Sequence, residues 1–320
     1  MKKLIKSIVT VMLAGCLAAS MASGVFAADN LTLGTGGTTG TYYAIGGVMA
    51  TVLNPILEES QLVVTSTGAS KANIQEIEDG GADLATVQND VMYYAYTGTD
   101  LFSSEGAYDS FRAIAGLYDE TVQIITCNPD IKTVADLAGK SVSVGDAGSG
   151  VEFNAKQILK GYGLTFDDIK KGNFSFKESA EGLQNGTLDA CFITAGAPNS
   201  ALQELAFTAG LELVPVGGAE AEAICNKHPF YTKTTIPAGT YKGTDVDTEA
   251  LAIRATLAVS KSLDDETVYE MTKALFENLE KLGAAHAKGK EVGAKSAVTG
   301  VSVPFHPGAA KYFREIGVLD

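Results

Sequence analysis

The chain has 320 residues, 24 of them basic and 38 acidic, which gives a formal net charge of −14. A surface this acidic repels the phosphates of DNA and RNA, so nucleic acid is excluded as the expected partner. The length suits two lobes of ordinary size.

Residues 1–27 are predicted to be an export signal that is removed from the mature protein. A basic start with three lysines precedes an almost wholly apolar or small stretch from 8 to 21, and Val25-Phe-Ala27 is typical of a cleavage site. A second interpretation treats Leu13-Ala-Gly-Cys16 as a lipobox with a lipidated Cys16, although the residues after it continue apolar instead of forming a polar tether. Both predict an exported, periplasmic or otherwise extracytoplasmic protein. Cleavage after Ala27 leaves 21 basic and 38 acidic residues, a net charge of −17.

A glycine-rich turn separates the first predicted strand from the first predicted helix. The apolar run 31–33 is followed by Gly34-Thr-Gly-Gly-Thr-Thr-Gly-Thr-Tyr-Tyr43, and apolar residues then recur with helical spacing from 45 to 56. In this layout the free N–H groups at a helix N-terminus face a ligand, and the helix dipole favours a carboxylate or phosphate. A tight turn with a helix cap needs only about one glycine and one threonine, so the excess indicates a binding loop. The predicted ligand contacts in it are Gly36, Gly37, Thr38, Thr41 and Tyr42.

Two more predicted strands, 62–66 and 84–87, end in polar turns that lead into helices. Short turns between alternating strands and helices predict a parallel sheet covered by helices on both faces. Ligands bind beyond the carboxyl ends of the strands in such sheets. Helix capping alone would explain a serine or an aspartate in these turns. The candidate ligand contacts here are Thr67, Gly68, Ser70, Gln88 and Asp90.

The pattern then starts again in a second predicted lobe. An extended run from 112 to 126, broken only by Asp119-Glu120, is predicted to cross into it. The strand 141–144, the turn Gly145-Asp-Ala-Gly-Ser-Gly150 and the helix 151–161 repeat the opening arrangement. A further strand, 189–194, ends in another small-residue turn. The candidate contacts from this lobe are Gly148, Ser149, Gly150, Thr194, Gly196 and Ala197.

The second crossing between the lobes is expected near 217–230. This gives lobe I as residues 28–119 and 226–320, and lobe II as residues 120–225. No arginine or lysine lies in either glycine-rich turn, so no bidentate arginine clamp is visible, although Arg112 could reach the cleft from the first crossing.

Several motifs resemble one family in the same order along nearly all of the mature chain. They are the turn 34–43, Gly145-Asp-Ala-Gly-Ser-Gly150, Gly186-Thr-Leu-Asp-Ala190 with Thr194-Ala-Gly-Ala-Pro198, Ile236-Pro-Ala-Gly-Thr-Tyr241, and Pro304-Phe-His-Pro-Gly308. Together they resemble the TAXI family, the solute-binding subunits of tripartite ATP-independent periplasmic (TRAP) transporters. Arg254 departs from that pattern, because the family is usually apolar in its strand.

The resemblance implies a type II periplasmic-binding-protein fold, with two doubly wound α/β lobes joined by a two-crossing hinge. It implies that the lobes close on a small carboxylate, such as a glutamate- or glutamine-like amino acid or a dicarboxylate. The partner would be a membrane permease of the TRAP type, driven by an ion gradient that is usually sodium. We expect a monomer without a cofactor.

Enzyme motifs are weak or missing in this sequence. The glycines at 34, 36 and 40 only loosely approach a dinucleotide fingerprint, and no acidic residue follows the strand 62–66 to hold a ribose. Neither a Walker-type phosphate loop nor a Gly-x-Ser-x-Gly elbow occurs. The histidines, His228, His286 and His306, lack the spacing of metal ligands, so no catalytic or metal-binding residue is predicted.

Two alternatives stay open. The first is the binding protein of an ABC importer that takes phosphate or another oxyanion, since the same hydroxyl-rich helix N-termini would hold that ligand. The second is an exported enzyme on the same two-lobed scaffold. Three cysteines remain after cleavage, Cys127, Cys191 and Cys225; their odd number predicts no disulfide framework, and we expect free thiols.

Overall fold

The computed structural model describes residues 30–57 and 60–320. The predicted signal peptide and the lipobox at Cys16 lie outside the described residues. No helix within the described ranges is long and apolar enough to cross a membrane.

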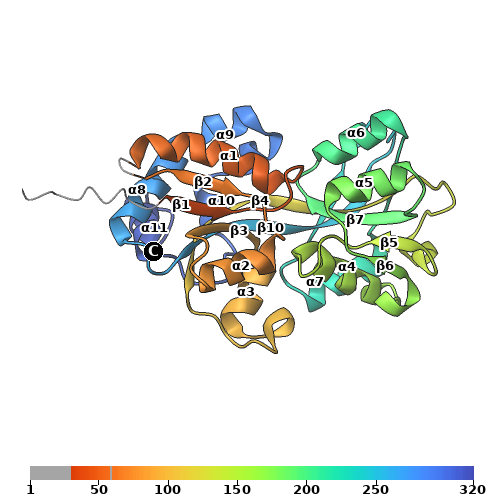
Figure 1. Cartoon of the computed structure of the whole chain (residues 1–320), viewed down its shortest axis with the longest axis horizontal. Coiled ribbons are helices and arrows are strands. Elements are labelled where there is room, and N and C mark those ends of the chain that lie inside the picture. Colours follow the sequence, from red (N-terminus) through yellow and green to blue (C-terminus); the bar gives the residue numbers. More distant parts are fainter. Residues whose placement is uncertain (1–29, 58–59) are drawn as a thin grey trace, which may run out of the picture.

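Within this part of the chain, one mixed sheet of ten strands runs through the whole molecule (Figure 1). The strand order is β2-β1-β3-β10-β4-β7-β5-β6, with β8 paired to β4 and β9 paired to β10. The strands are β1 (Leu31–Gly34), β2 (Leu62–Thr65), β3 (Leu84–Gln88), β4 (Phe111–Thr126), β5 (Ser141–Ser143), β6 (Lys170–Gly172), β7 (Ala190–Ala195), β8 (Glu212–Val214), β9 (Thr232–Ile236) and β10 (Thr248–Ser260).

Two parallel groups of strands are joined by one antiparallel pair. Strands β1, β2 and β3 are parallel to one another, and so are β5, β6 and β7. The long strands β4 and β10 run antiparallel between these groups and pair along most of their length. We call the part built on β1–β3 lobe I and the part built on β5–β8 lobe II.

The side chains of β4 and β10 show where the chain passes between the lobes. In β4, Leu117 and Tyr118 belong to the lobe I core, whereas Val122 belongs to the lobe II core. In β10, residues 251 and 253 pack in lobe II, and residues 255 and 257 pack in lobe I. The crossings therefore lie at residues 119–121 and at residue 254.

The position of the second crossing differs from the predicted 217–230. Strand β9 and the first half of β10 pair with each other, from Thr232 with Ala252 to Ile236 with Thr248, and this segment belongs to lobe II. The predicted boundary at residue 225 is therefore too early by almost thirty residues. At the crossing, Arg254 pairs with Asp119 at 2.8 Å and donates to the Ser296 carbonyl, so its charge is neutralised although it lies in the sheet.

Helices cover both faces of the sheet in each lobe (Figure 1). Lobe I has α1 (Thr41–Leu53), α2 (Ser70–Glu78), α3 (Asn89–Thr97), α8 (Asp265–Phe276), α9 (Leu279–Ala285), α10 (Ala294–Val298) and α11 (Pro307–Glu315). Lobe II has α4 (Gly150–Gly161), α5 (Phe176–Gln184), α6 (Ser200–Thr208) and α7 (Gly218–Lys227). Short 3₁₀ turns are η1 (Asn54–Ile56), η2 (Asp100–Phe102), η3 (Val134–Leu137), η4 (Phe166–Asp168) and η5 (Ala287–Glu291).

Helix α1 shows how the sequence pattern positions the start of a helix at the lobe interface. Ile45, Met49 and Leu53 recur every four residues and are almost completely buried against the sheet of lobe I. Gly47, on the opposite side of the helix, is exposed. This burial fixes α1 along the sheet, so that its N-terminus meets lobe II.

Candidate ligand-binding site

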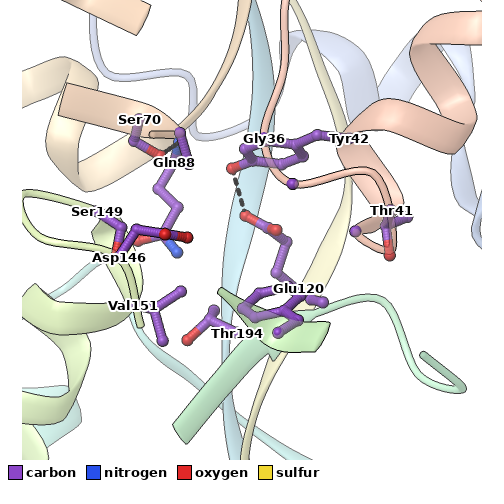
Figure 2. Close-up of a pocket in the computed structure, with 15 residues that line it drawn as sticks. Gly36, Thr41, Tyr42, Ser70, Gln88, Glu120, Asp146, Ser149, Val151 and Thr194 are labelled. Atoms are coloured by element: carbon purple, nitrogen blue, oxygen red, sulfur yellow. Dashed lines mark hydrogen bonds between the residues drawn. The ribbon is translucent and has the colours of Figure 1, made fainter. Parts of the chain in front are cut away.

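A pocket lies between the two lobes, beyond the carboxyl ends of β1, β3 and β7 (Figure 2). Its volume is about 40 Å³. One ordered water needs roughly 10–15 Å³ by this measure, so the pocket in this conformation suits a molecule of few heavy atoms. Its lining consists of Gly36, Gly37, Gly40, Thr41, Tyr42, Ala69, Ser70, Gln88, Glu120, Asp146, Ser149, Val151, Phe176, Thr194 and Ala195.

The structure brings together half of the residues that the sequence singled out. Those that line the pocket are Gly36, Gly37, Thr41, Tyr42, Ser70, Gln88, Ser149 and Thr194. They come from both lobes and from turns up to 158 residues apart in the chain, as expected for strand ends that converge at one edge.

Four other predicted contacts from lobe I lie outside the lining. Thr38 is exposed beside a separate surface hollow next to α5 and α6. Thr67 bonds the Thr35 carbonyl and the Asn73 side chain, which holds its own turn together, and Gly68 lies tightly against α2. Asp90 is buried and accepts a 2.8 Å hydrogen bond from the Val91 N–H.

Four predicted contacts from lobe II also serve the fold instead of lining the pocket. The Gly148 N–H donates to Glu152 at 2.7 Å, in a left-handed turn with φ 75°. A side chain at Gly150 would overlap the Gln88 amide, so this glycine allows α4 to approach β3 closely. The Gly196 N–H donates to Thr41 Oγ1 at 3.0 Å, and Ala197 precedes a cis peptide bond to Pro198.

The N-termini of α1 and α2 point at the pocket and have no side-chain cap. Gly40 and Ala69 are their N-cap residues, and neither provides an acceptor. By contrast, Ser149 caps α4 by accepting the Glu152 N–H at 3.2 Å. The first-turn N–H groups of α1 and α2 are thus available to an anionic group of a ligand.

Ala69 holds an unusual backbone conformation where it lines the pocket. Its φ of 66° and ψ of −148° lie in a region that side-chain-bearing residues rarely adopt. Such strain, of order 1–3 kcal/mol, is concentrated at functional sites.

A buried carboxyl group lies beside the start of α1, and Figure 2 shows its side chain pointing towards Tyr42. Tyr42 donates to Glu120 Oε2 at 2.6 Å, and both side chains are almost completely buried. Burial raises the pKa of Glu120 to about 8; the hydrogen bond from Tyr42 opposes this shift, and the neighbouring Asp90 adds to it. A carboxyl group in this setting keeps its proton near neutral pH unless a cation pairs with it.

The lining contains a second carboxyl group, that of Asp146. Asp146 lies in the turn before α4, and burial raises its pKa, with a smaller contribution from Glu178. The described lining contains no arginine or lysine. Lys288 packs against Gly196 outside the lining and pairs with Glu291 at 2.6 Å.

Arg112, which the sequence offered as a possible clamp, does not line the pocket. It lies near the start of β4, where it pairs with Asp109 at 2.8 Å and sits over the Tyr96 ring. The three histidines lie outside the lining as well, and His286 and His306 act as helix N-caps.

Two polar atoms of the lining lack hydrogen-bond partners among the described residues. Gln88 Oε1 and Thr194 Oγ1 are both unpartnered, although their side chains are about 97% buried or more. Gln88 Nε2 donates to Asn154 Oδ1 at 3.1 Å, which orients the amide. Buried polar groups almost always find a partner, so two free ones in one pocket indicate a ligand position.

Sequence reasoning missed seven lining residues. Glu120 had a visible signal, because it interrupts an otherwise apolar extended run together with Asp119. Gly40 and Asp146 lay inside turns that were already singled out. No sequence signal distinguished the others, which are Ala69, Val151, Phe176 and Ala195.

Several solved structures have a fold similar to that of this chain. The alkanesulfonate-binding protein SsuA from Xanthomonas axonopodis pv. citri, bound to MOPS, is 14% identical with a TM-score of 0.53, over 91% of this chain and 80% of that chain. A protein from Bordetella bronchiseptica RB50 is 16% identical with a TM-score of 0.54, over 89% and 82%. PhnD1 from Prochlorococcus marinus (MIT 9301), in complex with methylphosphonate, is 14% identical with a TM-score of 0.51, over 81% and 87%.

The predicted fold class is confirmed: the chain has the α/β fold of periplasmic binding proteins. A family model matches residues 33–317, and the chain belongs to the NMT1-like family. Fold, family and interlobe pocket together define it as a solute-binding protein. The class of solute-binding proteins is broader than the TAXI family that the motifs resemble.

Proposed function

We propose that the protein is an exported receptor that binds a small organic acid between its two lobes and delivers it to a membrane transporter. The observation that carries this proposal is the pocket itself. There, the uncapped starts of α1 and α2 face unpartnered buried atoms of Gln88 and Thr194. Export rests on the predicted signal at residues 1–27 and on the class of the protein.

The first candidate ligand is a small carboxylate, a glutamate- or glutamine-like amino acid or a dicarboxylate, delivered to a TRAP permease. The motif resemblance to the TAXI family supports the partner. The pocket supports a ligand that is not a simple dianion, because its ionisable lining residues, Glu120 and Asp146, are acids. A doubly charged anion would approach two carboxyl groups in a poorly solvated site without a cation to balance it.

The second candidate is an oxyanion receptor of an ABC importer. The names of similar solved structures, an alkanesulfonate-binding protein and a complex with methylphosphonate, support this candidate better than they support a TRAP carboxylate. The N–H groups of α1 and α2 would serve a sulfonate or phosphonate as well as a carboxylate. Both candidate functions would thus use the same pocket residues. They differ in the acid group of the ligand, which is a carboxylate in the first and a sulfonate or phosphonate in the second.

A binding role is favoured over catalysis. The fold and family support a solute-binding protein at this level.

A thermal-shift screen of residues 28–320 tests the proposal. The panel contains amino acids, dicarboxylates, keto acids, phosphate, alkanesulfonates and methylphosphonate. A compound that binds only the folded state raises the melting temperature by mass action, by several degrees at about one hundred times its Kd. A shift with carboxylates favours the first candidate, and one with sulfonates or phosphonates favours the second. The absence of any concentration-dependent shift across the panel would contradict the receptor function.

A further inference from the structure

We propose that His228 is a positioning residue of the ligand pocket. It acts through a series of hydrogen bonds that decides which end of the Gln88 amide is left for a ligand. His228 itself lies outside the lining, whereas Gln88 belongs to it (Figure 2). This inference rests on the proposed function, since the orientation of Gln88 matters only if the pocket binds a ligand.

Four hydrogen bonds in series run from the pocket to His228. Gln88 Nε2 donates to Asn154 Oδ1 at 3.1 Å, which joins β3 of lobe I to α4 of lobe II. Asn154 Nδ2 donates to the Tyr231 hydroxyl at 2.9 Å, and this hydroxyl donates to Gln157 Oε1 at 2.8 Å. Gln157 Nε2 lies 3.4 Å from His228 Nδ1. We call these five side chains the relay.

The relay is shielded from water up to its last member. Gln88, Asn154, Tyr231 and Gln157 are each at most 8% exposed, and His228 is half-buried. Buried amides and hydroxyls keep their hydrogen-bond partners, because water cannot replace them. The bonds of the relay must therefore all point the same way, and reversing the last bond reverses the others.

The protonation state of His228 selects one of these two directions. The Nε2 group of Gln157 can only donate, so His228 Nδ1 accepts and the ring is neutral, with its proton on Nε2. A doubly protonated ring has no acceptor left, so Gln157 would turn its Oε1 to the ring and its Nε2 to Tyr231. The two ends of an amide have the same shape, so the same rotation at Asn154 and Gln88 completes the reversal.

The reversal changes what Gln88 offers to a ligand. In the structure Asn154 engages Nε2 of Gln88, and Oε1 is an unpartnered acceptor. In the reversed relay Oε1 would accept from Asn154, and an N–H of Nε2 would be free. A free acceptor suits a hydroxyl group or another donor of a ligand, whereas a free donor suits an oxygen of an ionised acid. An acid would thus bind best with the relay reversed and His228 protonated.

Several charged or titratable groups surround the far end of the relay. They act on His228 or Tyr231, or line the same surface hollow as His228, and are Asp90 and Tyr94 of α3, Asp100 of η2, Lys156 and Lys160 of α4, and Cys225 and Lys227 of α7. Burial lowers the pKa of His228, and Lys227 adds to this shift, so the ring is mainly neutral at pH 7 before an acid binds. An acid that selects the reversed relay must therefore raise this pKa.

The test follows the three histidines of residues 28–320 by heteronuclear NMR of the imidazole nitrogens. The probes are glutamate, succinate, pyruvate, methanesulfonate and methylphosphonate. Without a probe, the neutral His228 ring should carry its proton on Nε2. A probe that binds the reversed relay about tenfold more tightly should raise the pKa of His228 by about 1, because binding and protonation are linked reciprocally. His286 and His306 are internal controls, because neither belongs to the relay.

Gln157→Met separates the relay from a simple effect of charge. It interrupts the relay outside the pocket lining, so the probe should still bind while the rise in the His228 pKa disappears. A rise caused only by the negative charge of the probe acting through space would persist in this variant. Gln203→Met, at an exposed site of α6, is the matched control and should keep the rise. Thermal unfolding checks that both variants fold.

The outcomes separate this inference from the proposed function. A neutral His228 ring with its proton on Nδ1, an unchanged His228 pKa on binding, or a rise that persists in Gln157→Met would each overturn the relay and leave the receptor function standing. The first two results come from the wild type and do not depend on the variant. If none of the five probes binds the wild type, the proposed function and this inference fail together.

Discussion

At the scale of single residues, Glu120 is the side chain that shapes the chemistry of the pocket most. It lies in the middle of a buried strand, with its pKa raised to about 8 by burial. The titratable groups that interact with it come from several elements: Tyr42 of α1, Asp90 of α3, Lys288 of η5, and Asp119 and Tyr118 of β4. Asp146, in the turn before α4, is the other carboxyl group of the lining.

This pKa predicts how the affinity for an amino acid changes with pH. An amino acid whose ammonium group pairs with Glu120 needs the carboxylate form of that residue, so its affinity should rise from pH 6 to about pH 8 and level off above it. Calorimetry in buffers of different ionisation enthalpy should detect a released proton near pH 7. Glu120→Gln should remove both effects. An affinity that falls over this pH range would mean that protonated Glu120 donates to the ligand instead.

Ala69 yields a second prediction at this scale. Its φ of 66° is strained for alanine, and glycine adopts that conformation freely. Glycine relieves the backbone strain but also makes the unfolded chain more flexible, which offsets part of the gain. The net effect of Ala69→Gly should be a rise of about 1 kcal/mol in the free energy of unfolding. Urea unfolding measures this, with Ala72→Gly inside α2 as the control that should lose about 1 kcal/mol. Equal destabilisation by both substitutions would show that Ala69 is not strained.

At the scale of elements, the strand–turn–helix units were the most predictable part of the molecule. The turn before α1 and the turn before α4 carry dense glycine and hydroxyl patterns, and Gly36, Gly37 and Ser149 from these turns line the pocket. The second crossing was misplaced because residues 217–245 have no clear periodicity. An edge strand such as β9, with mostly exposed side chains, leaves little hydrophobic signal.

Gly150, the first residue of α4 in lobe II, lies against Gln88 of lobe I. A Cβ there would overlap the Gln88 side chain, whereas a Cβ at Gly47 in α1 meets open space. Both glycines are helical, so alanine should favour each helix by up to about 1 kcal/mol. Gly150→Ala should nevertheless weaken ligand binding about tenfold or more, by displacing α4 from Gln88. Calorimetry compares it with Gly47→Ala, and equal affinities would contradict this role.

At the scale of the whole molecule, the lobes meet through hydrogen bonds around the pocket. Gly196 donates to Thr41 at 3.0 Å, and Asn199 Nδ2 donates to the Thr39 carbonyl at 3.0 Å. On the other side of the pocket, Gln88 donates to Asn154. Long-range contacts of this kind between turns cannot be inferred from local sequence patterns. We propose that they hold the closed arrangement, and that a ligand shifts an open–closed equilibrium towards it.

A substitution at Asn199 can alter this open–closed equilibrium and still keep the N-cap of α6. Its Oδ1 accepts two N–H groups at the start of α6, a role that aspartate keeps. Asn199→Asp loses the donor to Thr39 and places a carboxylate against that carbonyl. We expect a larger radius of gyration in small-angle scattering and about tenfold weaker binding.

The control is Asn185→Asp, at an exposed site at the end of α5. It should leave both the radius of gyration and the affinity unchanged. A radius of gyration in Asn199→Asp equal to that of the wild type, with or without ligand, would show that this bond does not hold the lobes together.

The central claim is that a small acid binds at the glycine-rich turn between the lobes. The most direct measurement is titration of the best ligand from the screen into Gly37→Val, with Gly47→Val as the control. A Cβ at either glycine meets open space, but only Gly37 lines the pocket. We predict that Gly37→Val folds normally and loses detectable binding, while Gly47→Val binds like the wild type. Wild-type affinity in a folded Gly37→Val would contradict the claim.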